Sequence, residues 1–267
     1  MKDFDLLVID DEEVIIDSIL KVGKVENLRI DTTLSGTEGL AKIEQFNYKL
    51  IVCDLILPDL NGFEIVQKVV SNNISSPIIV TTGYSTIDNA IKAMQYGAID
   101  FLPKPFTFDE ILGCIRKGIR YSKIISDRVV KIGSKNSSPL LFIPCPPSYY
   151  RFGLTSWLSI EKDFNVRCGL TDLNMRTIDD IEVIKTANNF DTVIQGQEYL
   201  TIVCKQGIEY KILSPASGKI LEINENVLKD SRLIEKDPFF EGWIYKLVAS
   251  DLENELKYLT SCSTDRL

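Results

Sequence analysis

The sequence contains no histidine in 267 residues. Without an imidazole, the chain cannot build a Ser-His-Asp or a Cys-His nucleophilic site, because both depend on histidine as the base. Zinc sites of mixed cysteine and histidine ligands are excluded for the same reason. A phosphohistidine relay step within this chain is excluded as well, so any phosphoryl group that the chain carries must sit on another type of side chain.

Cysteine is present, but not with the spacing of a metal site. No two cysteines form a Cys-x-x-Cys pair, and they are scattered over both halves of the chain: Cys53, Cys114, Cys145, Cys168, Cys204 and Cys262. A four-cysteine zinc site would have to be assembled from distant loops. We interpret the cysteines as reduced packing residues, which is typical of a cytoplasmic protein.

Long apolar runs are missing too. No run approaches the roughly 18 residues that a membrane span needs, and the apolar run near the N-terminus is too short for a signal peptide. Residues 140–267 carry 14 Lys and Arg against 19 Asp and Glu, and the whole chain has a formal charge of −8. DNA-binding domains usually have a basic surface. We therefore expect a cytoplasmic protein with neither a membrane nor a nucleic acid as its partner.

The length allows two ordinary domains, each with its own core. In the first half, short apolar runs alternate with amphipathic helical patterns. The expected strands are 6–9, 28–33, 50–53, 77–80 and 101–102, and the expected helices are 13–25, 36–46, 62–70, 87–96 and 108–121. This alternation predicts βαβ units, and hence an α/β domain with a doubly wound, five-stranded parallel sheet.

Polar residues stand where these expected strands end. Asp10 and Asp11 follow the first strand, Asp54 the third, Thr82 the fourth and Lys104 the fifth. The carboxyl ends of parallel strands meet at one edge of a sheet, where binding sites form. Three carboxylates gathered at one edge repel one another unless a cation lies among them. A set of oxygen ligands favours Mg²⁺ as that cation. With a lysine and a hydroxyl opposite, the pattern predicts a site for phosphoryl transfer.

The same stretches resemble the receiver domain of two-component response regulators, a flavodoxin-like fold. The resemblance covers residues 1–122 and is carried by 8–12 (Val-Ile-Asp-Asp-Glu), 53–62 (Cys-Asp-Leu-Ile-Leu-Pro-Asp-Leu-Asn-Gly), 81–84 (Thr-Thr-Gly-Tyr) and 97–106 (Gly-Ala-Ile-Asp-Phe-Leu-Pro-Lys-Pro-Phe). It implies a sensor histidine kinase as partner. A homodimer through the helices expected at 87–96 and 108–121 is a further expectation.

The resemblance also implies a role for each matching residue. Asp54 is the phosphoacceptor, and Mg²⁺ is bound by Asp10, Asp11, Asp54 and the backbone carbonyl of Ile56. Thr82 and Lys104 contact the phosphoryl group. Phe101 falls at the aromatic switch position, which turns inward as Thr82 moves, and the Lys104–Pro105 peptide bond is expected to be cis.

The pattern changes after the receiver-like half. Residues 123–139 are expected to form a linker, because Gly, Ser and Asn gather toward its end, although its apolar residues can also continue the last helix. Short β-rich runs then predict a compact, mostly β domain: 140–143, 166–170, 182–184, 192–194, 200–203, 210–213 and 218–223. A short helix is expected at 251–259.

This second half, residues 140–267, resembles the H protein of the glycine cleavage system. The resemblance is carried by 214–226 and 236–244, with further support from Trp157 and 169–172, and it implies a lipoyl-domain-like barrel-sandwich hybrid. Carriers of this family bear lipoate on a lysine at an exposed hairpin turn. Here that position falls on Gln206 or Gly207, and Gly207 fits a tight turn that needs a positive φ. Lys205 and Lys211 lie nearby, but the use of either requires a shift of the turn.

These observations favour a response regulator in which phosphorylation of Asp54 controls a non-DNA-binding, H-protein-like interaction domain whose protein partner is unknown. On this interpretation the chain is not a metabolic enzyme. One alternative is a carrier protein under phosphorylation control, with lipoate on Lys205 or Lys211. A weaker alternative is a transcriptional regulator, although two adjacent helices with a basic face are not apparent.

Overall fold

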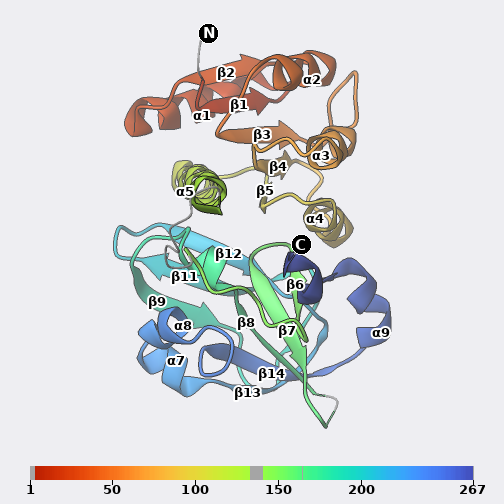
Figure 1. The fold of residues 1–267 in the computed structure, drawn as a ribbon, viewed down its shortest axis with the longest axis vertical. Coiled ribbons are helices and arrows are strands. Elements are labelled where there is room, and N and C mark those ends of the chain that lie inside the picture. Colours follow the sequence, from red (N-terminus) through yellow and green to blue (C-terminus); the bar gives the residue numbers. More distant parts are fainter. Residues whose placement is uncertain (1–3, 133–140, 164, 267) are drawn as a thin grey trace. The chain divides into compact units, whose positions relative to one another are not determined.

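The computed structural model describes residues 4–132, 141–163 and 165–266. The chain divides into two compact units, one built mainly from the residues before segment 133–140 and the other mainly from those after it (Figure 1). Within the described ranges, no helix is both long enough and apolar enough to cross a membrane.

The first unit is a five-stranded parallel sheet with helices on both faces. Its strands are β1 (Leu6–Ile9), β2 (Ile30–Thr33), β3 (Leu50–Asp54), β4 (Ile78–Thr82) and β5 (Asp100–Pro103), in the order β2-β1-β3-β4-β5. Its helices are α1 (Glu13–Glu26), α2 (Gly36–Gln45), α3 (Gly62–Ser71), α4 (Ile87–Gln95) and α5 (Phe108–Ile132). Figure 1 shows α1 and α5 on one face and α2, α3 and α4 on the other. The predicted doubly wound α/β fold is confirmed.

The central strands are apolar throughout because both faces of the sheet are covered. All four residues of β1 are fully buried, and β3 and β4 are buried along their whole length. Two side chains fix where helices begin: Ser35 accepts a hydrogen bond from the Glu38 amide at the start of α2, and Asn61 accepts one from the Phe63 amide at the start of α3. Such N-caps satisfy amides that have no partner within the helix.

Helix α5 differs from the prediction. The sequence pattern places its end at Tyr121, whereas the helix continues to Ile132 and so includes the first ten residues of the predicted linker. The apolar residues between Ile124 and Ile132 continue the helical spacing, and no glycine or proline interrupts it before Gly133. The remainder of the predicted linker, residues 133–139, lies outside the described residues.

The second unit is built from two antiparallel sheets. One has the order β10-β13-β14-β8-β7-β6-β15 and the other the order β12-β11-β9. The strands are β6 (Tyr150–Phe152), β7 (Ser156–Ile160), β8 (Val166–Leu170), β9 (Ile181–Thr186), β10 (Thr192–Val193), β11 (Glu198–Cys204), β12 (Glu209–Leu213), β13 (Gly218–Ile223), β14 (Trp243–Ala249) and β15 (Thr260–Ser261). The prediction of a mostly β domain is confirmed.

Short helices and a buried tryptophan complete the second unit. The α-helices are α6 (Asp172–Met175), α7 (Glu225–Lys229), α8 (Arg232–Lys236) and α9 (Leu252–Glu255), and 3-10 turns cover Leu256–Tyr258 and Cys262–Arg266. The Trp157 side chain is fully buried, and its indole N–H donates to the carbonyls of Leu170 and Pro238, each at 3.0 Å. This shared hydrogen bond ties β8 to the segment before β14.

One predicted strand of the second unit is wrong, and one predicted helix is only partly of the α type. The described part of the expected strand 140–143 is a bend without strand pairing. The helix expected at 251–259 consists of α9 followed by a 3-10 turn, and Leu259 lies outside both. Apolar composition alone does not separate a strand from an irregular segment that packs one or two of its side chains.

Two glycines of the first unit offer a matched test of its packing. A Cβ on Gly62 would collide with the Asp54 carbonyl oxygen and lie 2.6 Å from the Leu55 Cα, whereas a Cβ on Gly83 would have nothing within 4 Å. We expect Gly62→Ala to lower the free energy of unfolding of this unit by about 1–3 kcal/mol, because backbone atoms cannot move aside. Gly83→Ala should change it by less than about 0.5 kcal/mol.

Urea unfolding of the full chain checks this expectation. Circular dichroism follows the unfolding of both units. Tryptophan fluorescence follows only the second unit, which contains both tryptophans, Trp157 and Trp243. The expected result is an earlier dichroism transition in Gly62→Ala with an unchanged fluorescence transition. Equal midpoints for the two variants would contradict the packing argument.

Candidate functional site

The strand ends of the first unit bring the predicted site residues to one edge of the sheet. Asp10 follows β1 directly, Asp54 is the last residue of β3, Thr82 is the last of β4, and Lys104 follows β5. The parallel register pairs Ile9 with Cys53, Asp54 with Thr81 and Thr82 with Pro103, so these four strands end level with one another. The convergence that the sequence pattern predicts is therefore present.

Lys104 forms the centre of the site. Its Nζ lies 2.6 Å from Asp54 Oδ2, 3.0 Å from Asp10 Oδ1 and 2.9 Å from Glu12 Oε1, and it donates a hydrogen bond to each. The Lys104 side chain is only 6% exposed, and the Asp10 and Asp54 side chains are similarly buried. Three carboxylates therefore share a single ammonium group. Two of them are buried with it, whereas the Glu12 side chain is 52% exposed.

The charges of the site depend on this lysine. Burial raises the pKa of Asp10 to about 6, and the hydrogen bond and the charge of Lys104 limit that rise. Burial lowers the pKa of Lys104, but its hydrogen bonds to Asp54, Glu12 and Asp10 more than offset this effect and hold that pKa above its usual value. Lys104 is thus a fixed positive charge at neutral pH.

The oxygen atoms at this edge fit a small hard cation. Asp10, Glu12 and Asp54 are the acidic residues of the described chain that offer ligand atoms within 4.8 Å of one another. Asp10 Oδ2 is buried and, although it lies 2.9 Å from Lys104 Nζ, it accepts no hydrogen bond. A buried carboxylate oxygen without a hydrogen-bond partner, in a set of oxygen donors only, is what Mg²⁺ coordination would satisfy.

The acidic set differs from the predicted one. Asp11 is exposed and does not belong to the group, whereas Glu12, which was not predicted as a site residue, does. Glu12 was missed although it stands in the Val-Ile-Asp-Asp-Glu stretch, because its spacing says nothing about its contact with Lys104, 92 residues later. The Ile56 amide donates to Asp54 Oδ1 at 3.0 Å, which holds the Ile56 backbone beside the phosphoacceptor candidate. The role of the Ile56 carbonyl as a Mg²⁺ ligand stays a prediction.

Thr82 lies on β4, which is next to β3, and Phe101 lies on β5, on the far side of β4. Thr82 is fully buried, its hydroxyl accepts a hydrogen bond from the Tyr84 amide at 3.1 Å, and its carbonyl accepts one from the Lys104 amide at 2.8 Å. Phe101 is half-buried on β5. The Lys104–Pro105 peptide bond is cis, as expected.

The β11–β12 hairpin of the second unit shows where a carrier lysine would stand. The Gly207 amide donates to the Cys204 carbonyl at 2.8 Å, the Cys204 amide donates to the Ile208 carbonyl at 2.9 Å, and Gly207 has a φ of 80°. This is a three-residue hairpin loop with glycine in the left-handed position, as predicted. Its residues are Lys205, Gln206 and Gly207.

The two nearby lysines differ in their relation to this turn. Lys205 is a turn residue, but it stands one position before Gln206, so it would take the carrier position only if the turn moved by a residue. Its side chain is 67% exposed and lies 3.2 Å from Asp180 Oδ2. Lys211 lies within β12 opposite Thr201, so it could reach the turn only if the strand register moved.

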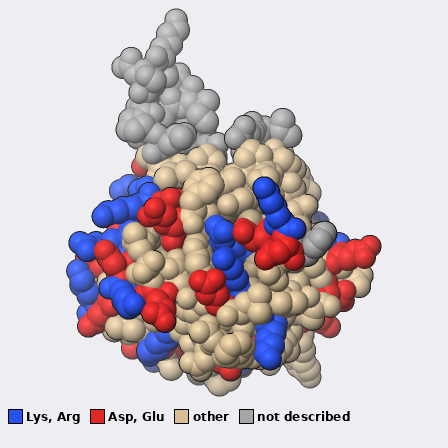
Figure 2. Space-filling model, turned by 90° about the horizontal axis from the view of Figure 1, so that it is seen from below, with Lys and Arg blue, Asp and Glu red and all other residues tan. Residues whose placement is uncertain are grey.

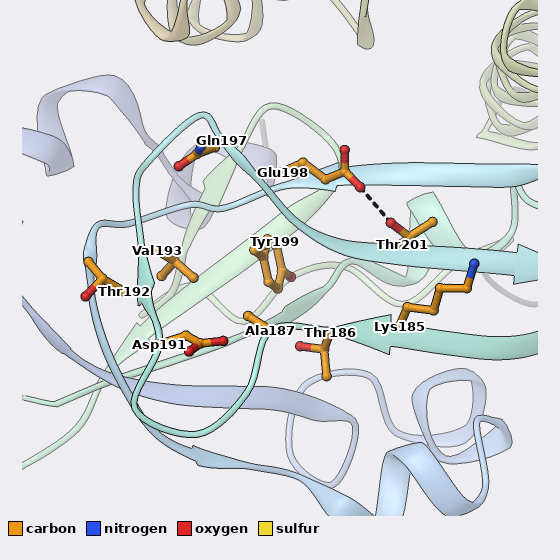
Figure 3. A pocket seen from close by; sticks show the side chains of 10 residues that line it. All are labelled: Lys185, Thr186, Ala187, Asp191, Thr192, Val193, Gln197, Glu198, Tyr199 and Thr201. Atoms are coloured by element: carbon orange, nitrogen blue, oxygen red, sulfur yellow. Dashed lines mark hydrogen bonds between the residues drawn. The ribbon is translucent and has the colours of Figure 1, made fainter. Parts of the chain in front are cut away.

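A surface hollow of about 680 Å³ lies between β9, β10 and the first half of β11 (Figure 3). It is lined by Lys185, Thr186, Ala187, Asp191, Thr192, Val193, Gln197, Glu198, Tyr199 and Thr201. Its lysine is already paired with Glu209 at 2.7 Å, and Glu198 accepts a hydrogen bond from the Thr201 hydroxyl. The sequence did not predict this hollow, because its walls come from separate segments. It adjoins the opposite end of β11 from the Lys205 turn.

Comparison with known proteins assigns each unit to a family. Residues 6–116 match the family model of the response regulator receiver domain, and residues 149–265 match that of the glycine cleavage H-protein. The chain joins a receiver domain to an H-protein-like domain. The receiver domain is that of a response regulator, and both resemblances stated from the sequence are confirmed.

Individual relatives resemble only parts of the chain. The cell cycle response regulator CtrA of Brucella ovis is 31% identical over 128 residues, which are 48% of this chain and 55% of that protein. The chain thus spans about half the length of the curated relatives it matches. A CheY-like receiver domain protein from Methanospirillum hungatei JF-1 is 27% identical with a TM-score of 0.43, over 46% of this chain and 98% of that one. The glycine cleavage system H protein of Mycobacterium marinum is 23% identical with a TM-score of 0.37, over 40% and 87%.

The Lys104 contacts generate a prediction about stability and metal binding. Without the ammonium group, Asp10, Glu12 and Asp54 face one another without a cation, so we expect Lys104→Met to lower the free energy of unfolding by about 3 kcal/mol in the absence of Mg²⁺. Added Mg²⁺ should then stabilise this variant more than the unmodified chain, because the ion replaces the lost charge. The exposed Lys68→Met is the matched control.

Urea unfolding with and without Mg²⁺ measures both effects. If Mg²⁺ stabilised Lys104→Met no more than the unmodified chain, the carboxylate group would not be a cation site. If Lys68→Met behaved as Lys104→Met does, the effect would come from net charge rather than from the site.

Proposed function

We propose that the chain is a two-component response regulator in which Asp54 takes up a phosphoryl group from a sensor histidine kinase and thereby controls the H-protein-like domain. The observation that supports this most is the burial of Lys104 between Asp54 and Asp10 at the ends of parallel strands. On this proposal the protein is cytoplasmic and works as a switch rather than as a metabolic enzyme. Its output domain binds a protein and not DNA.

The receiver residues have distinct parts in this reaction. An Asp54 oxygen attacks phosphorus, forms an acyl phosphate bond, and displaces the donor's leaving group. Lys104 and the Thr82 hydroxyl hold the phosphoryl oxygens, and the Ile56 amide keeps the Asp54 carboxylate oriented. Asp10, Asp54 and the Ile56 carbonyl would hold Mg²⁺, with Asp11 as the resemblance implies or Glu12 as the geometry favours. The ion would neutralise the charge that builds up on the transferred group.

The switch would follow from the movement of Thr82. When its hydroxyl turns to a phosphoryl oxygen, it leaves the Tyr84 amide and vacates space into which Phe101 can turn. This changes the surface formed by α4, β5 and α5, which we propose as the homodimer contact. A bias of a few kcal/mol is enough for such a change of population.

The phosphoacceptor assignment is tested by Asp54→Asn. We expect this variant to lose phosphorylation by acetyl phosphate, at least a hundredfold in rate, because an amide oxygen is a poor nucleophile. The fold should remain, since the amide has nearly the shape of the carboxylate. Asp17→Asn, on the exposed face of α1, is the matched control and should keep the unmodified rate.

Phosphorylation is measured by intact mass after incubation with Mg²⁺ and acetyl phosphate. Uptake by Asp54→Asn at the unmodified rate would show that another side chain is the acceptor. Loss of uptake in Asp17→Asn as well would show that the assay reports something other than the site.

A carrier role for the second unit is the competing function. One observation favours it: Lys205 stands on the hairpin turn with its side chain largely exposed. Two observations oppose it. The position that the H-protein resemblance assigns to the lysine is occupied by Gln206 or Gly207, and the Lys205 ammonium lies near Asp180. We therefore propose an interaction domain that has kept the carrier fold without its lipoyl arm.

Intact mass after expression in a host that lipoylates H proteins, supplied with lipoate, tests this interpretation. We expect no added lipoyl group on the chain, while an authentic H protein expressed alongside it is modified. An added group that Lys205→Arg abolishes would replace the interaction-domain proposal with the carrier role. Loss of the added group in Lys211→Arg instead would place the arm on β12.

A further inference from the structure

The loop after Asp54 brings a backbone group to the site. Residues 55–61 connect β3 to α3, and at the near end the Ile56 amide donates to Asp54 Oδ1 at 3.0 Å. The base of the loop is closed by the Gly62 amide, which donates to the Leu55 carbonyl at 2.9 Å, and by a bridge between Ile56 and Asn61. The Ile56 side chain is 49% exposed, so packing in the core does not fix its position. Its backbone must be held from elsewhere.

Asp59 at the far end of this loop is bound to the start of another helix. Asp59 Oδ1 accepts a hydrogen bond from the Gly36 amide at 2.9 Å, and Oδ2 accepts one from the Thr37 amide at 2.9 Å and one from the Ser35 hydroxyl at 2.7 Å. These donors are the N-cap and the first two residues of α2. A carboxylate at this place is favoured by the helix dipole and by amides that have no partner within the helix.

Apolar contacts support the same attachment. A Cβ on Gly36 would lie 2.9 Å from the Leu60 Cβ and 3.0 Å from the Leu57 Cδ1, so the loop rests directly on the backbone of α2. Leu57 is 8% exposed and therefore anchors the middle of the loop in the core. The hydrogen bonds from Ser35, Thr37 and Gly36 also hold the pKa of Asp59 well below its usual range, so the carboxylate stays charged at neutral pH.

We propose that Asp59 is a positioning residue of the phosphorylation site. It ties the 55–61 loop to α2, and this attachment holds the Ile56 amide on Asp54 and the Ile56 carbonyl where it can meet a cation. The proposal rests on the proposed function for the roles of Asp54 and Ile56. The proposal adds Asp59, which does not itself touch the reacting group. It also adds α2, the helix to which Asp59 is bound, which has no other part in the reaction.

The test compares Asp59→Ala with a control that weakens the same helix. Ala41→Gly weakens α2 at an exposed position by about 1 kcal/mol. It leaves in place the bonds that Asp59 accepts from the Ser35 hydroxyl and from the Gly36 and Thr37 amides. Asp59→Asn, which keeps one of the two acceptor oxygens and loses the charge, is the conservative variant. Each variant is made in the full chain.

Three quantities are measured for each variant: the hydrogen-exchange rate of the Ile56 amide without metal, the dissociation constant for Mg²⁺ by calorimetry, and the phosphorylation rate with acetyl phosphate at saturating Mg²⁺. For Asp59→Ala we expect exchange about tenfold faster, Mg²⁺ binding about tenfold weaker and a similar loss of rate. Ala41→Gly should stay within about twofold of the unmodified chain in all three, although it lowers the unfolding midpoint. Asp59→Asn should recover part of the loss, because one of its two side-chain acceptors remains.

The outcomes separate this proposal from the proposed function. Unchanged Ile56 exchange and Mg²⁺ binding in Asp59→Ala would overturn the positioning role, and so would equal losses in Ala41→Gly, which would mean a general effect of α2. If the unmodified chain took up no phosphoryl group, the proposed function would fail. The exchange rate of the Ile56 amide would still decide whether Asp59 holds the loop.

Discussion

The receiver site depends on one buried cation among three carboxylates. Two like charges about 4 Å apart repel by about 4 kcal/mol at an effective dielectric of about 20, so Asp10, Glu12 and Asp54 could not share this space as free anions. Lys104 offsets part of that repulsion because it donates a hydrogen bond to each of the three. The parallel register makes this contact available, since it ends β1, β3, β4 and β5 at the same level. The ion pairs of Lys104 therefore depend on the way in which the sheet is folded.

That constraint explains how a small covalent change could be felt elsewhere. The Lys104 amide donates a hydrogen bond to the Thr82 carbonyl, and the Thr82 hydroxyl accepts one from the Tyr84 amide. On the proposed function, a phosphoryl group on Asp54 competes for both the ammonium and the hydroxyl. The segment that starts at Gly83 then loses its hydrogen bond to β4. Because Tyr84 is 69% exposed, little packing opposes its movement. On the proposed function, this loss of a hydrogen bond is how a change at Asp54 reaches α4.

The sequence was most informative where a polar residue directly follows a short apolar run. Asp10, Asp54, Thr82 and Lys104 each follow a short apolar run, so their convergence could be predicted from the strand ends alone. Glu12 could not be predicted, because its contact with Lys104 depends on a side-chain rotamer rather than on spacing. The end of α5 was predicted too early, at Tyr121. The helical spacing continues past that residue, and it does not show where a domain ends. Asp59 was not singled out, because the α2 N-terminus that it binds lies 23 residues earlier in the chain.

The turn in the second unit shows how a carrier fold can persist without its arm. Gly207 has a φ of 80°, and a side chain there would cost about 1–2 kcal/mol of backbone energy. Of the two positions that the resemblance allows, the turn geometry thus disfavours a lysine at Gly207, whereas Gln206 has no such restriction. The hairpin itself is held by backbone hydrogen bonds and by the buried side chains of Cys204 and Ile208, none of which involves an arm. On the proposed function, the hairpin therefore needs no lipoyl group to keep its fold.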